Sequence, residues 1–121
     1  RAIVEAFFAG LAYPRIRDAV AAHAPDLVLS VHPMAQRMAC DAAAEMAARG
    51  SAARARRVPV ATVVTDLGTA HPMWFDRRVD TVYVPSEAVR AVAAREGVEM
   101  ERVVALGLPV RAQFAGAGAA G

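Results

Sequence analysis

The chain has 121 residues, which suits one domain of modest size, and its net charge of +2 makes it only mildly basic. All 14 of its basic residues are arginines, whose planar guanidinium can bond two phosphate oxygens at once. The single cysteine, Cys40, excludes a disulfide framework and argues against a thiolate metal site, and no apolar run approaches the roughly 20 residues of a membrane-spanning helix.

Two helices are predicted at the start of the chain. Residues 2–9 are helix formers with apolar side chains on one face, and Gly10 interrupts them. Pro14 is well placed to open a second helix, because proline is tolerated in a first turn. That second helix is expected to run to about His23, and Pro25 stops it.

A short buried strand is predicted next, at residues 27–31, from the apolar run Leu-Val-Leu-Ser-Val. Pro33 then opens a third helix over residues 34–49, which Gly50 closes. Cys40 lies in the middle of this helix among Ala and Met, so we expect it to be a small core residue.

In the second half of the chain, predicted strands are separated by a long loop and a helix. Ser86 is a good N-cap for a helix that Gly97 ends, and residues 66–80 are expected to be mainly loop with at most a short helix. Three further strands are predicted, at residues 60–65, 81–84 and 102–106.

This alternation predicts an α/β fold, with a Rossmann-like parallel sheet and helices covering both of its faces. The basic loop that holds Arg54, Arg56 and Arg57 would lie at the amino ends of the strands. Ligands of open α/β sheets bind at the opposite edge, so we interpret this loop as a solvated one.

Polar side chains follow the carboxyl ends of the predicted strands. Two imidazoles, one carboxylate and one guanidinium are expected at this edge, from His32, Asp66, His71 and Arg111. The tripeptide His-Pro-Met occurs twice here, beginning at His32 and at His71. Each residue also has a structural interpretation: a histidine can bond a backbone carbonyl, Asp66 can cap a turn, and Arg111 can be an ordinary surface residue.

The only Trp of the chain lies in the loop Ala-His-Pro-Met-Trp-Phe-Asp-Arg-Arg, residues 70–78. Trp74 and Phe75 are either core residues of a small lid or rings at a membrane interface. No dinucleotide-binding glycine motif, P-loop, zinc spacing or nucleic-acid-binding motif is present. The residues alone therefore indicate a parallel α/β domain whose polar edge suits phosphate and a membrane surface.

Three stretches resemble the monogalactosyldiacylglycerol synthase family. They are PDLVLSVHPM at residues 25–34, VPVATVVTDLGTAHPMWF at 58–75, and the run from VYVPSEAV to GLPVRAQF at 82–114. The resemblance implies transfer of galactose from UDP-galactose to diacylglycerol by a GT-B enzyme, which has two Rossmann-like domains. It also implies a peripheral protein of the plastid envelope membrane.

Within such an enzyme, residues 1–114 would form part of the N-terminal, acceptor-side domain, and residues 115–121 a flexible tail. A Gly-rich loop with the proposed catalytic base would precede the chain, and the domain that holds most of the UDP-galactose would follow it. This piece alone is then expected to be inactive, and no cofactor or metal is expected.

The resemblance also implies roles for single residues. Arg111 resembles the position that reaches the donor diphosphate, where a guanidinium would stabilise departing UDP. Trp74 is expected to be partly exposed, and Arg77 and Arg78 are expected to attract the anionic lipids that activate the enzyme. The residues expected to bind acceptor or lipid are His32, Pro33, Asp66, His71, Pro72, Trp74, Phe75, Arg77 and Arg78.

Two alternatives remain open from the sequence. A diacylglycerol glucosyltransferase of the same fold would differ mainly in the donor domain, which this chain does not include. A non-catalytic α/β module that binds a phosphorylated small ligand belongs to a different class. Such a module would bind its ligand tightly by itself.

Overall fold

The computed structural model describes residues 2–49 and 57–115. Its centre is one sheet of four strands, ordered β1-β2-β3-β4 with every neighbouring pair parallel. The strands are β1 (Val28–Ser30), β2 (Val60–Val63), β3 (Thr81–Val84) and β4 (Val103–Ala105). All four predicted strands are confirmed, although three of them are shorter at their ends than predicted.

The helices are α1 (Ala2–His23), α2 (Pro33–Arg49), α3 (Glu87–Arg95) and α4 (Ala112–Ala115), with two 3-10 turns, η1 (Pro72–Trp74) and η2 (Met100–Arg102). Ser86 caps α3 as predicted, since its side chain accepts a hydrogen bond from the N–H of Val89. The segment between β2 and β3 is mainly loop around η1, also as predicted. The closure of α2 at Gly50 lies outside the described residues.

The start of the chain differs from the prediction, because one helix replaces the expected two. α1 runs unbroken through Gly10 and Pro14. Proline inside a helix removes one hydrogen bond and crowds the carbonyl four residues earlier. Here that earlier residue is Gly10, which has no side chain and leaves the backbone free to adjust. The helix ends at His23, whose ring Nδ1–H donates to the carbonyl of Ala19 at 2.8 Å.

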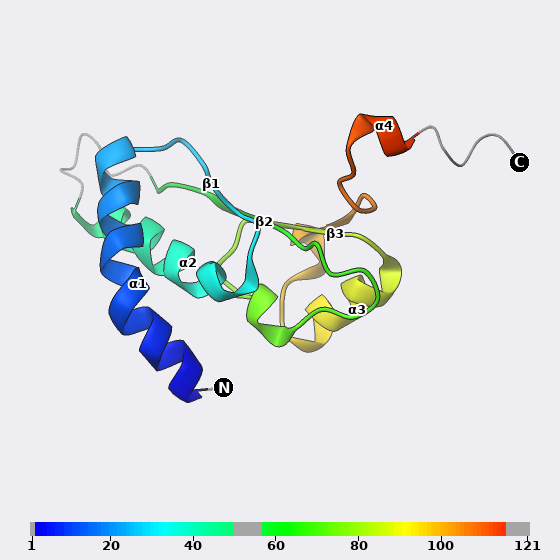
Figure 1. Cartoon of the computed structure of the whole chain (residues 1–121), viewed down its shortest axis with the longest axis horizontal. Coiled ribbons are helices and arrows are strands. Elements are labelled where there is room, and N and C mark those ends of the chain that lie inside the picture. Colours follow the sequence, from blue (N-terminus) through cyan, green and yellow to red (C-terminus); the bar gives the residue numbers. More distant parts are fainter. Residues whose placement is uncertain (1, 50–56, 116–121) are drawn as a thin grey trace, which may run out of the picture.

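The first helix packs on α2 instead of burying a face of its own against the sheet (Figure 1). Of its side chains that the structure describes, none is buried. Tyr13 makes the main polar contact, donating its hydroxyl hydrogen to Glu45 of α2 at 2.5 Å. Partial burial and the hydrogen bond to this carboxylate raise the pKa of Tyr13 to about 12.

Helices α1, α2 and α3 all lie on one side of the sheet, so the prediction that helices cover both faces is wrong for the described chain (Figure 1). Right-handed crossovers that always step in the same direction place their connections on the same face. The strand order β1-β2-β3-β4 has no reversal of direction, and only a reversal would place a helix on the second face.

The hydrophobic core lies between the sheet and these helices. Val82, Val84 and Val103 of the sheet pack there against Val89 and Ala93 of α3, and all five are buried. Cys40 of α2 is a buried core residue, as predicted. Burial raises the pKa of its thiol to about 11, so at neutral pH it is a protonated, unreactive group.

The first strand is not the buried strand that its apolar sequence predicts. β1 is an edge strand, and Leu29 at its centre is 54% exposed on the face away from the helices. Leu27 and Val31, which flank β1, are exposed as well. A continuous apolar run predicts burial on both faces of a sheet, and here only the face towards the helices is covered.

Candidate functional site at the carboxyl edge of the sheet

The predicted site residues follow the carboxyl ends of the parallel strands. His32 comes two residues after β1, Asp66 and His71 lie in the loop after β2, and Arg111 lies between β4 and α4. His32, His71 and Arg111 are exposed and Asp66 is half-buried. Because the strands are parallel, these segments leave the same edge of the sheet.

The two His-Pro-Met tripeptides form the same local structure. In each, the ring Nδ1 of the histidine accepts a hydrogen bond from the methionine N–H two residues later, at 3.3 Å for His32 and 3.2 Å for His71. The residue after the methionine donates its N–H to the histidine carbonyl, at 3.1 and 3.0 Å respectively. Each histidine is thus the N-cap of the helix or turn that begins at Pro33 or Pro72.

The carboxylate of Asp66 holds the loop between β2 and β3. Its Oδ2 accepts a hydrogen bond from the indole Nε1–H of Trp74 at 2.8 Å and another from the backbone N–H of His71 at 3.3 Å. One oxygen therefore connects the end of β2 to both ends of the η1 segment. The structural alternative considered for Asp66, turn capping, describes this contact well.

Asp66→Ala should destabilise the chain by about 1 kcal/mol, because the indole N–H loses its acceptor while water can partly replace the half-buried carboxylate. Asp66→Asn should recover most of this loss, since its amide oxygen can accept the same two hydrogen bonds. Denaturant unfolding of the two variants measures the difference. Equal losses in both variants would mean that the negative charge, and not the acceptor, matters.

Trp74 is a core residue, and the expectation that it is partly exposed is wrong. Its side chain is 1% exposed and belongs to the main hydrophobic cluster, beside Val79 and Ala70. Phe75 is half-buried and packs against the same cluster. Large rings in a loop fit a core as well as an interface, and the nearby Asp66 supplies the polar partner that a buried indole requires.

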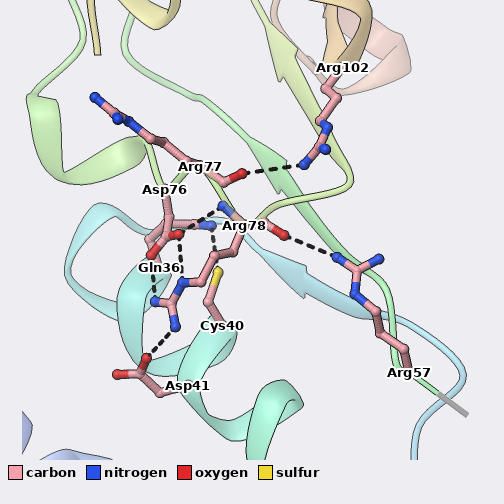
Figure 2. A network of polar contacts seen from close by, with 8 residues as sticks. All are labelled: Gln36, Cys40, Asp41, Arg57, Asp76, Arg77, Arg78 and Arg102. Atoms are coloured by element: carbon pink, nitrogen blue, oxygen red, sulfur yellow. Dashed lines mark hydrogen bonds and ion pairs between the residues drawn. The ribbon is translucent and has the colours of Figure 1, made fainter. Parts of the chain in front are cut away.

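Arg78 pairs with two carboxylates, and the one on Asp41 joins the loop to α2 (Figure 2). Its Nη1 lies 2.7 Å from Asp41 of α2, and its Nη2 lies 2.7 Å from Asp76. Its Nε and its backbone N–H both donate to the other oxygen of Asp76. Although the guanidinium was expected to attract anionic lipid, it is already paired with two negative charges.

The arrangement of these groups changes their proton affinities. Burial alone would raise the pKa of Asp76, but the hydrogen bonds and the charge of Arg78 outweigh it and hold this pKa below its usual value. The carboxylates of Asp76 and Asp41 in turn raise the pKa of Arg78 above its usual value. Asp76 is therefore ionised in the folded protein at every pH near neutrality.

Arg77 lies beside the end of α3, with its Nε 3.5 Å from the carbonyl of Glu96. Gly97 has a φ of +83°, and a Cβ there would lie 2.6 Å from the Arg77 Nε. The left-handed backbone favours glycine at this position, and a larger residue would also displace the Arg77 guanidinium from its present place. A role of Arg77 and Arg78 in lipid binding stays a prediction, but both side chains have structural partners.

Two further arginines hold the same segment from other elements. Arg102 donates its Nη1–H to the carbonyls of Arg77 and Val79, at 3.3 and 2.9 Å. Arg57 donates to the carbonyl of Arg78 at 3.2 Å (Figure 2). Arg57 also forms an ion pair with Asp80. Arg57 is exposed, as a solvated loop predicts, although it also makes these two contacts, while Arg54 and Arg56 lie outside the described residues.

Sequence reasoning missed Asp41, Asp76 and Arg102 as partners in this network. Asp41 is 37 residues from Arg78, and nothing in the local pattern connects the two. A usable signal existed only for Asp76, which lies two residues before Arg78 at the spacing of a side-chain turn.

Among residues 2–49 and 57–115, no helix combines the length and the apolar character that crossing a membrane requires. Nowhere in the described part of the chain do three or more His, Cys, Asp or Glu side chains gather so that they could hold a metal ion. The described polar side chains at the carboxyl edge instead make capping hydrogen bonds and ion pairs, and the imidazoles of His32 and His71 and the guanidinium of Arg111 are exposed.

Comparison with known proteins gives a consistent result. The chain is 36% identical over 90 residues to monogalactosyldiacylglycerol synthase 1, chloroplastic, of Arabidopsis thaliana, a match that covers 74% of this chain and 16% of that protein. It is 37% identical over 90 residues to the chloroplastic synthase of Spinacia oleracea, with the same coverage. It is 34% identical over 111 residues to the probable synthase 2 of Oryza sativa subsp. japonica, covering 89% of this chain and 22% of that protein.

The chain thus spans between about one sixth and one fifth of the length of these relatives. The sequence profile of the family described as monogalactosyldiacylglycerol (MGDG) synthase matches residues 1–110, which is most of the chain. On this evidence, the chain belongs to the monogalactosyldiacylglycerol synthase family.

Proposed function

We propose that the intact protein transfers galactose from UDP-galactose to 1,2-diacylglycerol, and that this chain supplies the acceptor side of the enzyme. The observation that carries the proposal is the family match over residues 1–110. In the proposed division, residues 1–114 belong to the N-terminal domain of a GT-B enzyme, and a second domain binds most of the nucleotide sugar.

The surface at the carboxyl edge suits a lipid acceptor with a polar head. Apolar side chains beyond β1, β2 and β4 are exposed there: Val31, Leu67, Leu106 and Val110. They accompany the exposed rings of His32 and His71. Apolar surface beside hydrogen-bonding groups is the combination that a glycerol backbone with acyl chains requires.

Arg111 is assigned to the diphosphate of the donor. It is exposed and directly precedes α4, in the Gly-Leu-Pro-Val-Arg turn that carries part of the resemblance. Its fixed charge would stabilise UDP as the glycosidic bond to it breaks, so the proposal calls on no metal or cofactor. The catalytic base is proposed to come from outside this chain.

The relatives are named as chloroplastic proteins, and we propose the plastid as the location of this protein as well. The acceptor is a membrane lipid, so the enzyme would work as a peripheral protein at the surface of the envelope membrane. Anionic lipids are proposed as further partners of that surface.

The intact enzyme, assayed with diacylglycerol vesicles, should use UDP-galactose in preference to UDP-glucose. Preference for UDP-glucose would instead support a glucosyltransferase of the same fold.

Arg111→Lys should lower kcat/KM by about 10-fold or more, because lysine keeps the charge but not the two-pronged hydrogen bond to a diphosphate. Unchanged kinetics in this variant would remove Arg111 from the site.

A further inference from the structure

The two histidines at the carboxyl edge have the same restricted proton arrangement. A backbone N–H points at Nδ1 of both His32 and His71, at 3.3 and 3.2 Å, so Nδ1 must be an acceptor and cannot carry a hydrogen. A neutral imidazole has one protonated nitrogen, which is then Nε2 in both rings. The sequence explains the repetition, since proline has no N–H and the first donor of each turn is the following methionine.

From this geometry we propose that His32 and His71 are hydrogen-bond donors to oxygen atoms of the substrates, and that neither ring acts as the general base. This inference rests on the proposed function for the identity of the substrates. Both rings are exposed, so each Nε2–H is available to a hydroxyl oxygen of the acceptor or to a phosphate oxygen of the donor. A base would need an unprotonated nitrogen towards the substrate, and the only unprotonated nitrogen is occupied by the cap.

The backbone of these turns is not the binding group. The methionine N–H is bonded to the ring, and the next N–H is bonded to the histidine carbonyl, so the first donors of both turns are already used. The capping hydrogen bonds do not use the exposed Nε2–H of each histidine, which is therefore the donor available to a ligand. Two such donors after neighbouring strands would orient an oxygen ligand without taking up its proton.

The chain contains its own control for the proton arrangement. Nδ1 of His23 lies 2.8 Å from the carbonyl oxygen of Ala19, which can only accept, so this ring carries its hydrogen on Nδ1. Long-range ¹H–¹⁵N NMR spectra of the chain at a pH where the rings are neutral should show Nε2–H for His32 and His71 and Nδ1–H for His23. Nδ1–H in either edge histidine would overturn the proposal.

Ligand addition tests the donor role without any turnover. Adding inorganic phosphate in one titration and a short-chain diacylglycerol in another to the intact protein should shift the Nε2 resonances of His32 and His71, but not those of His23. The titration that moves them identifies the source of the oxygen. Absence of any shift in both titrations would refute the donor role, whatever the activity of the enzyme proves to be.

Substitution of each histidine by asparagine separates its capping role from its role as a hydrogen-bond donor to substrate. Asn is a strong N-cap, so His32→Asn and His71→Asn should keep the capping hydrogen bond and the melting temperature while losing the distant N–H. Each should lower kcat/KM of the intact enzyme by about 3- to 10-fold, the effect of one lost hydrogen bond, without moving its pH profile. A cap-only role predicts full activity in these variants, and a general base predicts a changed pH profile.

The alanine variants provide the matched comparison, because they lose both the cap and the donor. They should lose stability as well as activity. If the intact protein transferred no galactose but the ring protons and ligand shifts were as expected, the proposed function would fail and the donor assignment would stand.

Discussion

Trp74→Ala should destabilise the chain by about 3–5 kcal/mol, the largest effect that we expect from a single substitution. The ring is 1% exposed at the centre of the main cluster, so its removal leaves a cavity and deprives Asp66 of its indole partner. Denaturant unfolding followed by far-UV circular dichroism measures the loss. A loss below 1 kcal/mol would show that the ring is not buried in solution.

Trp74→Phe is the matched variant, since it retains most of the apolar volume but has no N–H. It should cost less than the alanine change. The intrinsic fluorescence of the unsubstituted chain gives a test that does not depend on a variant folding. Trp74 is the only Trp, and its emission should be that of a buried indole and remain unchanged when anionic vesicles are added. A blue shift on vesicle addition would restore the interface role that burial argues against.

Arg78→Gln should destabilise the folded chain by about 2 kcal/mol, because Asp41 and Asp76 both lose their charged partner. The cost is less than for a fully buried pair, since the Arg78 side chain is 47% exposed and water screens the interaction. Arg90→Gln is the control, because the ion pair of Arg90 is with the exposed Glu87 and its loss should change stability little. Equal effects of the two changes would show that the position of Arg78 in the network is unimportant.

The effect of Arg78→Gln should depend on pH. The folded-state pKa of Asp76 is lowered, so its contribution to stability is present above its unfolded-state pKa of about 3.9 and is lost as pH falls through the lower folded value. The difference in unfolding free energy between the original chain and the variant should therefore be largest near neutral pH and shrink below about pH 4. A difference that stays constant down to the acid limit would exclude the Asp76 pair as its source.

The fold could be predicted from the sequence because its signals are local. Alternating apolar runs, Pro33 at a helix start and Ser86 at an N-cap each act within a few residues, and they place the strands and the helices that follow. The coverage of the sheet could not be predicted in this way. It depends on the direction of each crossover, which the sequence pattern between strands does not encode.

At the candidate site, too, the positions of residues could be predicted from the sequence but some of their roles could not. His32 and His71 follow predicted parallel strands, and because such strands all end at one edge of the sheet, the location of both residues could be predicted. The roles of Trp74 and Arg78 could not be predicted, because both depend on partners that only the fold brings near. An indole and a guanidinium suit a membrane surface and a core network equally well until Asp66 and Asp41 are placed beside them.

The consecutive strand order also has a kinetic consequence. Every strand pairs with the next strand along the chain, so no pairing in the described sheet closes a loop that contains another strand. The pairings of β3 with β2 and β4 close the shortest loops, and the arginine contacts around residues 76–80 join that same region. β1 pairs across the longest intervening segment and forms an edge of the described sheet, so we expect it to join the sheet after β2, β3 and β4 have paired.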